Sequence, residues 1–254
     1  MARRAGAVIS EVRAGGFEVL EKGDAGPVTE ADRRADALLR EALRSVCPAA
    51  WLSEETADHP DRLGAAAVWI VDPLDGTKEF VKGLPEYVVA IGLVERGVPI
   101  LGVIHNPETG DMFWAEQGGG AFRNGSRIRV AEGQRLLASR SEMKRGEFSP
   151  FADWQVDAIG SIQYKLALVA AGEGAATLSR GPKHEWDVCA GALIVEEAGG
   201  RATDMFGKPL RYNQPFPKVP GILAGAPEAF TRALTRLSQT GASDRMDELT
   251  SRNP

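Results

Sequence analysis

Apolar and polar positions along this 254-residue chain follow patterns that predict both helices and strands. Apolar residues recur every three or four positions over 27–46, which predicts a helix with Thr29 as its N-cap. The run AAAVWIV at 65–71 is short and continuous, as is typical of a strand buried on both faces. Two further apolar runs, 88–94 and 98–104, flank a charged ERG turn and predict a hairpin.

The segment 111–130 predicts strands joined by a tight turn at Asn124-Gly125. A strand over 156–160 is followed by a helix that begins at Ser161 and runs through 174. A strand over 176–180 and a helix over 187–200, capped by Asp187, complete the predicted elements. Strands and helices alternate in the second half of the chain but not in the first. We therefore predict an α/β (α+β) fold in which two sheets lie between layers of helices.

The composition turns polar around residues 131–150, which suggests a division into two halves. We expect an N-terminal α+β half at 1–133 and a C-terminal α/β half at 134–237. The segment 238–254 is polar and lacks aromatic residues, so we expect a disordered tail.

Composition restricts the class of protein. The formal net charge is −5, from 30 Lys and Arg against 35 Asp and Glu, which argues against a nucleic-acid partner held by a broad basic face. The two cysteines have no motif spacing, which fits a reducing cytoplasm. Charges at Glu95 and Arg96 interrupt the longest apolar region, so we expect no transmembrane segment and a cytoplasmic location.

The segment WIVDPLDGTKEF at 69–80 places two carboxylates where a buried strand ends. Pro73 stiffens the turn between Asp72 and Asp75, and rigid oxygen ligands suit a hard cation such as Mg²⁺. The backbone N–H groups of Gly76 and Thr77, at the start of a helix, would suit a phosphate oxygen. The alternative is structural: Asp75 caps that helix and Asp72 pairs with a lysine such as Lys78 or Lys82. Spacing alone favours neither interpretation.

Other acidic residues also lie at the edges of predicted elements, and each has an alternative structural role. Glu54, in LSEET, could be an ordinary solvated side chain. Asp32 could complete a capping box with Thr29, and Asp187 could be only an N-cap. The four acidic segments together indicate a site more strongly than any one of them does.

The segments VTEAD (28–32), LSEE (52–55), DPLDGTKEF (72–80) and WDVCAGALIVEEAGG (186–200) resemble, in order and spacing, the inositol monophosphatase superfamily of metal-dependent, lithium-sensitive phosphatases. The form DGTKEF further resembles its 3′(2′),5′-bisphosphate nucleotidase (CysQ-like) branch, which acts in sulfur assimilation. The resemblance implies a layered αβαβα sandwich of the inositol monophosphatase and fructose-1,6-bisphosphatase type.

The resemblance also implies roles for individual residues. The implied ligands of two or three Mg²⁺ ions are Glu54, Asp72, the carbonyl of Leu74, Asp75 and Asp187. Asp32 and Thr77, with Glu54, would orient and deprotonate the attacking water. The implied substrate-binding residues are Gly76, Thr77, Ser161, Lys165 and Arg180. The alternative for Lys165 is a lysine that extends from an amphipathic helix towards solvent.

The activity that this resemblance implies is hydrolysis of the 3′-phosphate of adenosine 3′,5′-bisphosphate by metal-activated water, giving AMP and phosphate. The nearest alternative is an inositol or other sugar monophosphatase, because a fold does not select its substrate. A third is a non-catalytic anion- or metal-binding protein. The expected partner is a small phosphate ester, with the chain acting as a monomer or homodimer.

Overall fold

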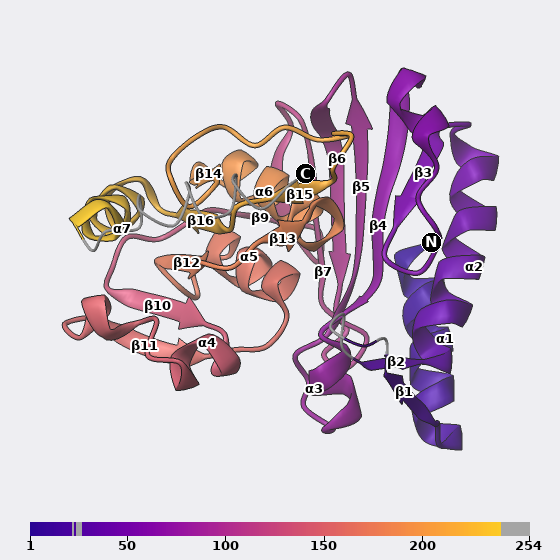
Figure 1. Cartoon of the computed structure of the whole chain (residues 1–254), viewed down its shortest axis with the longest axis horizontal. Helices are drawn as coiled ribbons and strands as arrows, with labels where there is room; N and C mark the ends of the chain where they lie inside the picture. The colour runs from indigo at the N-terminus through magenta and orange to yellow at the C-terminus, as the bar shows by residue number, and fades with distance from the viewer. Residues whose placement is uncertain (22, 24–26, 240–254) are drawn as a thin grey trace.

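The computed structural model describes residues 1–21, 23 and 27–239, and these residues form alternating layers of helix and sheet. From right to left in Figure 1 the layers are α1 (Ala2–Gly15) with α2 (Glu30–Val46), a seven-stranded sheet, α5 (Ile162–Ala170) with α6 (Cys189–Glu197), a five-stranded sheet, and α7 (Pro227–Gln239). The predicted αβαβα sandwich is therefore confirmed. None of the described helices is long and apolar enough to cross a membrane.

The first sheet contains the strands that the sequence predicted most clearly. Its order is β3 (Ala50–Ser53), β4 (Ala67–Asp75), β5 (Val88–Glu95), β6 (Val98–His105), β7 (Met112–Glu116), β8 (Gly120–Arg123) and β9 (Ser126–Ile128). β3 and β4 are parallel and the remaining neighbours are antiparallel. The hairpin of β5 and β6 and the turn at Asn124-Gly125, where both residues have positive φ, confirm the prediction.

The second sheet is mixed and is built from residues beyond 133. Its order is β11 (Gln155–Ala158), β10 (Arg135–Ala138), β12 (Ala176–Ser179), β16 (Ile222–Gly225) and β14 (Arg201–Thr203). The remaining elements are β1 (Val19–Glu21), β2 (Pro27–Thr29), β13 (Lys183–His184), β15 (Lys218–Val219), α3 (Thr77–Val81), α4 (Arg140–Lys144) and the 3₁₀ turns η2 (Pro60–Gly64), η3 (Ser149–Phe151) and η4 (Glu185–Asp187). The division into two domains at residue 133 remains a prediction.

Three apolar layers hold the sandwich together. One lies between α1 and α2 and the first sheet, one between that sheet and α5 and α6, and one between the second sheet and α7. β4 contributes to two of them: Trp69 and Val71 face the outer helices, while Val68 and Ile70 face the inner ones. The continuous apolar run of β4 thus reflects burial on both faces, as predicted.

Several predicted boundaries were wrong. β4 does not end at Asp72 but pairs with β5 as far as Asp75, with an irregularity between the two aspartates. α5 ends at Ala170 and not at 174, because a turn follows. The last predicted helix begins at Cys189, because residues 185–187 form a 3₁₀ turn. Residues 238 and 239 belong to α7, and the rest of the expected tail lies outside the described residues.

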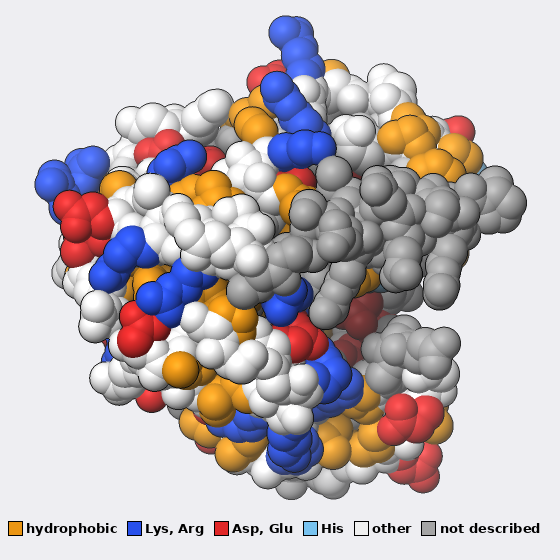
Figure 2. All heavy atoms as spheres, turned by 60° about the vertical axis from the view of Figure 1, so that its left-hand side comes forward, with side chains coloured by type: hydrophobic (Ala, Val, Ile, Leu, Met, Phe, Trp, Pro, Cys, Tyr) orange, Lys and Arg blue, Asp and Glu red, His pale blue; other side chains and the backbone are white. Residues whose placement is uncertain are grey.

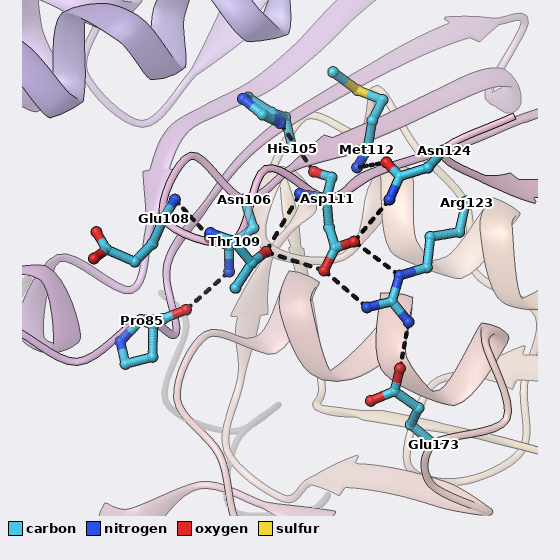
Figure 3. Close-up of polar contacts among 10 residues, drawn as sticks. All are labelled: Pro85, His105, Asn106, Glu108, Thr109, Asp111, Met112, Arg123, Asn124 and Glu173. Atoms are coloured by element: carbon cyan, nitrogen blue, oxygen red, sulfur yellow. Dashed lines mark hydrogen bonds and ion pairs between the residues drawn. The ribbon is translucent and has the colours of Figure 1, made fainter.

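A polar network around Asp111 connects parts of the chain that are distant in sequence (Figure 3). Asp111 accepts hydrogen bonds from Nε and Nη2 of Arg123 at 2.9 and 2.8 Å, and Arg123 also pairs with Glu173, beyond α5. The side chain of Asn106 donates to the carbonyl of Pro85 at 2.8 Å. This network joins the end of the first sheet to α5 and to the segment that leads into β5.

Gly102 in β6 allows α6 to pack directly on the first sheet. A Cβ at this position would lie 2.7 Å from the carbonyl oxygen of Ala190 and 3.2 Å from its Cα, both of them backbone atoms that cannot rotate away. The sheet and the helix can therefore approach this closely only if residue 102 has no side chain.

We expect Gly102→Ala to lower the free energy of unfolding by about 1–3 kcal/mol, because the added methyl overpacks this contact. Urea unfolding followed by circular dichroism measures the change. Gly64→Ala is the matched control, since a Cβ there meets nothing within 4 Å and φ is not positive. Equal stability of the two variants would refute this account of the α6 contact.

Candidate active site

Asp72 and Asp75 lie where β4 leaves its regular pairing with β5. Asp72 is 1% exposed, and its Oδ1 accepts a hydrogen bond from the N–H of Leu74 at 3.0 Å. Among the described residues, Asp72 forms no ion pair with Lys78 or Lys82. The structural alternative for Asp72 is therefore not what the fold uses.

Asp75 does not cap α3, which begins after Gly76 without a side-chain cap. Its Oδ2 instead accepts hydrogen bonds from Ser161 Oγ at 2.5 Å and from the N–H of Gln163 at 2.6 Å. Ser161, the N-cap of α5, has a φ of 55°, an unfavourable value for a residue with a side chain. Asp75 thus joins β4 to the start of α5, in the second half of the chain.

Gly76 gives the turn its shape. Its φ of 98° favours glycine, and an added Cβ would lie 2.6 Å from the carbonyl oxygen of Glu86. The chain can therefore turn from Asp75 into α3 only with glycine here, which sets the position of Thr77.

Asp32 completes the predicted capping box and also contacts Thr77. Its Oδ2 accepts hydrogen bonds from the N–H and Oγ1 of Thr29, both at 2.7 Å. Its Oδ1 lies 3.0 Å from Thr77 Oγ1, which is also 3.1 Å from the carbonyl oxygen of Leu74. The capping box therefore holds one carboxylate oxygen and leaves the other for Thr77.

Asp187 reaches the same region from the second half of the chain. It is the last residue of η4, and its Oδ2 accepts a hydrogen bond from the N–H of His184 at 2.7 Å. The sequence predicted that Asp187 caps the following helix, but α6 begins two residues later without a side-chain cap. The 3₁₀ turn accounts for the difference, because it moves the aspartate off the helix end.

These residues line a cavity of about 400 Å³. Figure 2 shows acidic side chains deep in a hollow of the surface, bordered by Lys and Arg side chains. Nine of the residues singled out from the sequence line the cavity: Glu54, Asp72, Leu74, Asp75, Gly76, Thr77, Ser161, Lys165 and Asp187. Asp32 lies behind Thr77, and Arg180 is not among the lining residues.

The cavity also contains residues that sequence reasoning did not assign to the site. They include four lysines, an arginine and a glutamate: Lys78, Lys82, Lys144, Lys183, Arg140 and Glu142. Among the described residues, none of the four lysines is in an ion pair. Lys78 lies within the DGTKEF motif, whereas Lys82 follows α3 and the others come from α4 and β13, so these residues meet only in the folded chain.

The buried carboxylates raise one another's pKa values. Burial raises the pKa of Asp72 well above its usual range, and the charges of Glu54, Asp75 and Asp187 raise it further. Burial, and then the charge of Asp75, raises the pKa of Asp187 to about 7. Burial also raises the pKa of Asp75, against the opposing hydrogen bonds from Ser161 and Gln163. In the absence of a cation, these groups resist being charged together.

This donor set suits a hard divalent cation. The carboxylates of Glu54, Asp72, Asp75 and Asp187 and the carbonyl of Leu74 supply oxygen alone, which favours Mg²⁺ over zinc. Within residues 1–21, 23 and 27–239, no three His, Cys, Asp or Glu side chains already converge as a metal site requires. In this arrangement Asp75 and Asp187 each direct one oxygen at protein donors.

Comparisons with known proteins relate nearly the whole chain to one family. A model of the inositol monophosphatase family matches residues 1–242. The 3′(2′),5′-bisphosphate nucleotidase CysQ of Escherichia coli K12 is 37% identical over 229 residues, covering 84% of this chain and 91% of its own. A histidinol-phosphatase of Chlorobaculum parvum is 37% identical over 205 residues, covering 76% and 78%. The solved inositol monophosphatase from Anabaena matches with a TM-score of 0.76 at 28% identity, over 94% and 92% of the two chains.

We expect the stability of the protein to depend on pH and Mg²⁺ together. The pKa of Asp187 is about 7 in the folded protein but about 4 in an unfolded chain. Between these values the folded state binds more protons, so without Mg²⁺ this group lowers the free energy of unfolding as pH rises from about 4 to about 7. Bound Mg²⁺ should remove the loss, because it favours the ionised carboxylates.

Urea unfolding at pH 5 and pH 8, in EDTA and in Mg²⁺, measures this effect. The comparison that matters is wild type against Asp187→Asn, because the variant removes both the titration of Asp187 and its repulsion of Asp72. The wild type should lose more stability between the two pH values in EDTA than the variant does. An identical pH dependence of the two proteins would contradict the interpretation.

Proposed function

The chain belongs to the inositol monophosphatase family of metal-dependent phosphomonoesterases, and we propose that it removes the 3′-phosphate of adenosine 3′,5′-bisphosphate, leaving AMP. The observation that carries this proposal is the charge distribution in the cavity. Besides the carboxylates, five lysines line the cavity: Lys78, Lys82, Lys144, Lys165 and Lys183. These cations exceed what one phosphate monoester needs, so they favour a substrate with a second phosphate.

Bound Mg²⁺, held by Glu54, Asp72, Asp75, Asp187 and the Leu74 carbonyl, would lower the pKa of water and stabilise charge on the phosphoryl oxygens. We propose two or three such ions. Hydrogen bonds fix the positions of three of these carboxylates: the N–H of Leu74 holds Asp72, Ser161 and Gln163 hold Asp75, and the N–H of His184 holds Asp187.

Asp32 and Thr77 would orient the attacking water. When Thr77 donates its only hydroxyl hydrogen to Asp32, its lone pairs are left to accept a hydrogen bond from water in the cavity. Burial raises the pKa of Asp32, while the hydrogen bonds from Thr29 and Thr77 oppose that rise. Asp32 is thus suited to receive a proton through Thr77. Glu54 borders the same space.

The backbone N–H groups of Gly76 and Thr77 would hold the phosphate that is cleaved, and Lys165 the one that is not. Lys165 is 2% exposed, and within the described part of the chain its Nζ has a single hydrogen-bond contact, at 3.4 Å, with the carbonyl oxygen of Ile159. We assign Ser161 to positioning Asp75, because its hydroxyl hydrogen is already used there. Lys183, which lines the cavity, takes the place that the resemblance gave to Arg180.

Relatives named as a histidinol-phosphatase and an inositol monophosphatase give two alternative substrates. Each of these substrates is a monophosphate, so several of the lysines that line the cavity would have no phosphate to bind. A non-catalytic anion-binding role would leave Asp32 and Thr77 without purpose beyond a helix cap.

Lys165→Ala should lower kcat/KM for adenosine 3′,5′-bisphosphate by about tenfold to a hundredfold, because a charge-assisted hydrogen bond to phosphate contributes roughly 1.5–3 kcal/mol. The loss on inositol 1-phosphate and histidinol phosphate should be small. Phosphate release from all three substrates at one Mg²⁺ concentration measures this, with the exposed Lys208→Ala as control. Equal losses on all three, or a wild type that prefers a monophosphate, would return the assignment to a general monophosphatase.

Thr77→Ala and Asp32→Asn should each reduce kcat strongly while leaving Mg²⁺ affinity nearly unchanged, since both residues act on the water. Because they act as one unit, the double variant should lose little more than either single variant. Steady-state kinetics with a Mg²⁺ titration of each variant tests this. If Asp32→Asn cost only the roughly 1 kcal/mol of stability expected for a lost cap, with kcat intact, its proposed role would be wrong.

A further inference from the structure

Glu142, in α4, has a buried carboxylate with only one oxygen satisfied. The residue is 3% exposed and lines the cavity. Its Oε1 accepts a hydrogen bond from Ser179 Oγ, at the end of β12, whereas Oε2 has no hydrogen-bond partner in the described part of the chain. A charged oxygen without water or a donor is costly, at roughly 1–3 kcal/mol or more.

The cations nearest in sequence do not supply the missing donor. Arg140 is held by Glu86 through both terminal nitrogens, and Arg145 pairs with Glu147 at 2.6 Å. Lys144 is exposed and forms no ion pair within the described ranges. The protein therefore leaves Glu142 Oε2 without a basic partner from its own helix.

Lys165 is a buried cation near Glu142: burial lowers the pKa of Lys165 and the charge of Glu142 opposes that fall, yet the two side chains are not within ion-pair distance of each other in the described structure. Both line the same cavity, and each has unused hydrogen-bonding capacity. A negative acceptor and a positive donor that remain apart can be bridged by a ligand that brings an acceptor for Lys165 and a donor for Glu142.

We propose that Glu142 accepts a hydrogen bond from a hydroxyl or amino group of the leaving alcohol, and so selects substrates that carry such a donor. This inference rests on the proposed function, because it concerns the same cavity. An ionised phosphate oxygen cannot donate a hydrogen bond to a carboxylate. The lysines therefore bind the phosphates, and Glu142 contacts the nucleoside. In adenosine 3′,5′-bisphosphate the two donors of this chemistry are the ribose 2′-hydroxyl and the adenine 6-amino group.

Ser179 acts here as a positioning residue. It is 1% exposed, and its hydroxyl holds Oε1, which fixes the carboxylate and leaves Oε2 for the substrate. A substrate without the donor would leave a buried charge unpaired, and sites of this kind reject such analogues strongly. Specificity would then arise from the cost of the unpaired carboxylate as well as from the bond itself.

The test is a cycle of substrate analogues against variants. Wild type and Glu142→Leu are assayed for kcat/KM on adenosine 3′,5′-bisphosphate, on its 2′-deoxy analogue, and on purine riboside 3′,5′-bisphosphate, which lacks the 6-amino group and has no N1–H donor in its place. We expect the wild type to penalise one analogue by about tenfold to a hundredfold, the value of one hydrogen bond to a charged group. That penalty should disappear in Glu142→Leu, and the analogue affected identifies the donor.

Two further variants keep the result decisive. Glu147→Leu removes a nearby carboxylate that does not line the cavity, and should retain the wild-type penalty. Glu142→Gln keeps the side-chain size, and replaces the leucine variant if that variant does not fold. Ser179→Ala should weaken the discrimination against the affected analogue. Its kcat on adenosine 3′,5′-bisphosphate should stay closer to the wild-type value than that of Glu142→Leu.

The outcomes separate this inference from the proposed function. Hydrolysis of adenosine 3′,5′-bisphosphate with no penalty on either analogue, or a uniform loss in Glu142→Leu on all three substrates, would overturn the inference and leave the function standing. If the wild type does not hydrolyse this substrate, the proposed function fails. The same cycle, run on the monoester that is hydrolysed and on its analogue without the neighbouring hydroxyl or amino group, then decides the role of Glu142.

Discussion

Repulsion between buried carboxylates is the interaction on which the site depends. Asp72 and Asp75 leave the end of β4, and Asp187 comes from a 3₁₀ turn more than a hundred residues later. The layered core brings these segments together, and burial with mutual charge raises their pKa values. Buried carboxylates that repel one another suit a bound cation, which would favour their ionised forms. Side chains that repel one another must also be held in position. Gly76, the Ser161 cap and the hydrogen bonds from backbone N–H groups hold these carboxylates.

Two helix caps of this protein also hold residues of the site. The capping box of α2 fixes one oxygen of Asp32 and presents the other to Thr77. The N-cap of α5 satisfies a helix terminus through Ser161 and also holds Asp75. Structural and functional interpretations of these motifs are therefore compatible, because a carboxylate has two oxygens and a hydroxyl can donate and accept at once. A serine or aspartate that caps a helix can still belong to a site.

The features predicted correctly from the sequence are mainly those that residues close together in the chain determine. The continuous run of β4, the hairpin of β5 and β6, the Thr29 cap and the sandwich of layers all follow from periodicity, turn residues and family resemblance. The aspartates and Glu54 that line the cavity were predicted because they lie in short contiguous motifs. The helix boundaries near Asp187 were missed because a 3₁₀ turn and an α-helix share the same composition. α1 was not predicted from its pattern, although Ala5 and Ile9 pack fully buried against the first sheet.

The remaining charged residues of the cavity could not be predicted in this way. Lys183 and Glu142 lie on β13 and α4, which are short and carry no motif, and only the folded chain brings them to the same cavity as the aspartates. A crystal structure with Mn²⁺ in place of Mg²⁺ tests the central claim most directly, since anomalous scattering locates the ions. The account predicts anomalous peaks among Asp72, Asp75 and Asp187. Fully occupied Mn²⁺ elsewhere, with none bound to these carboxylates, would contradict it.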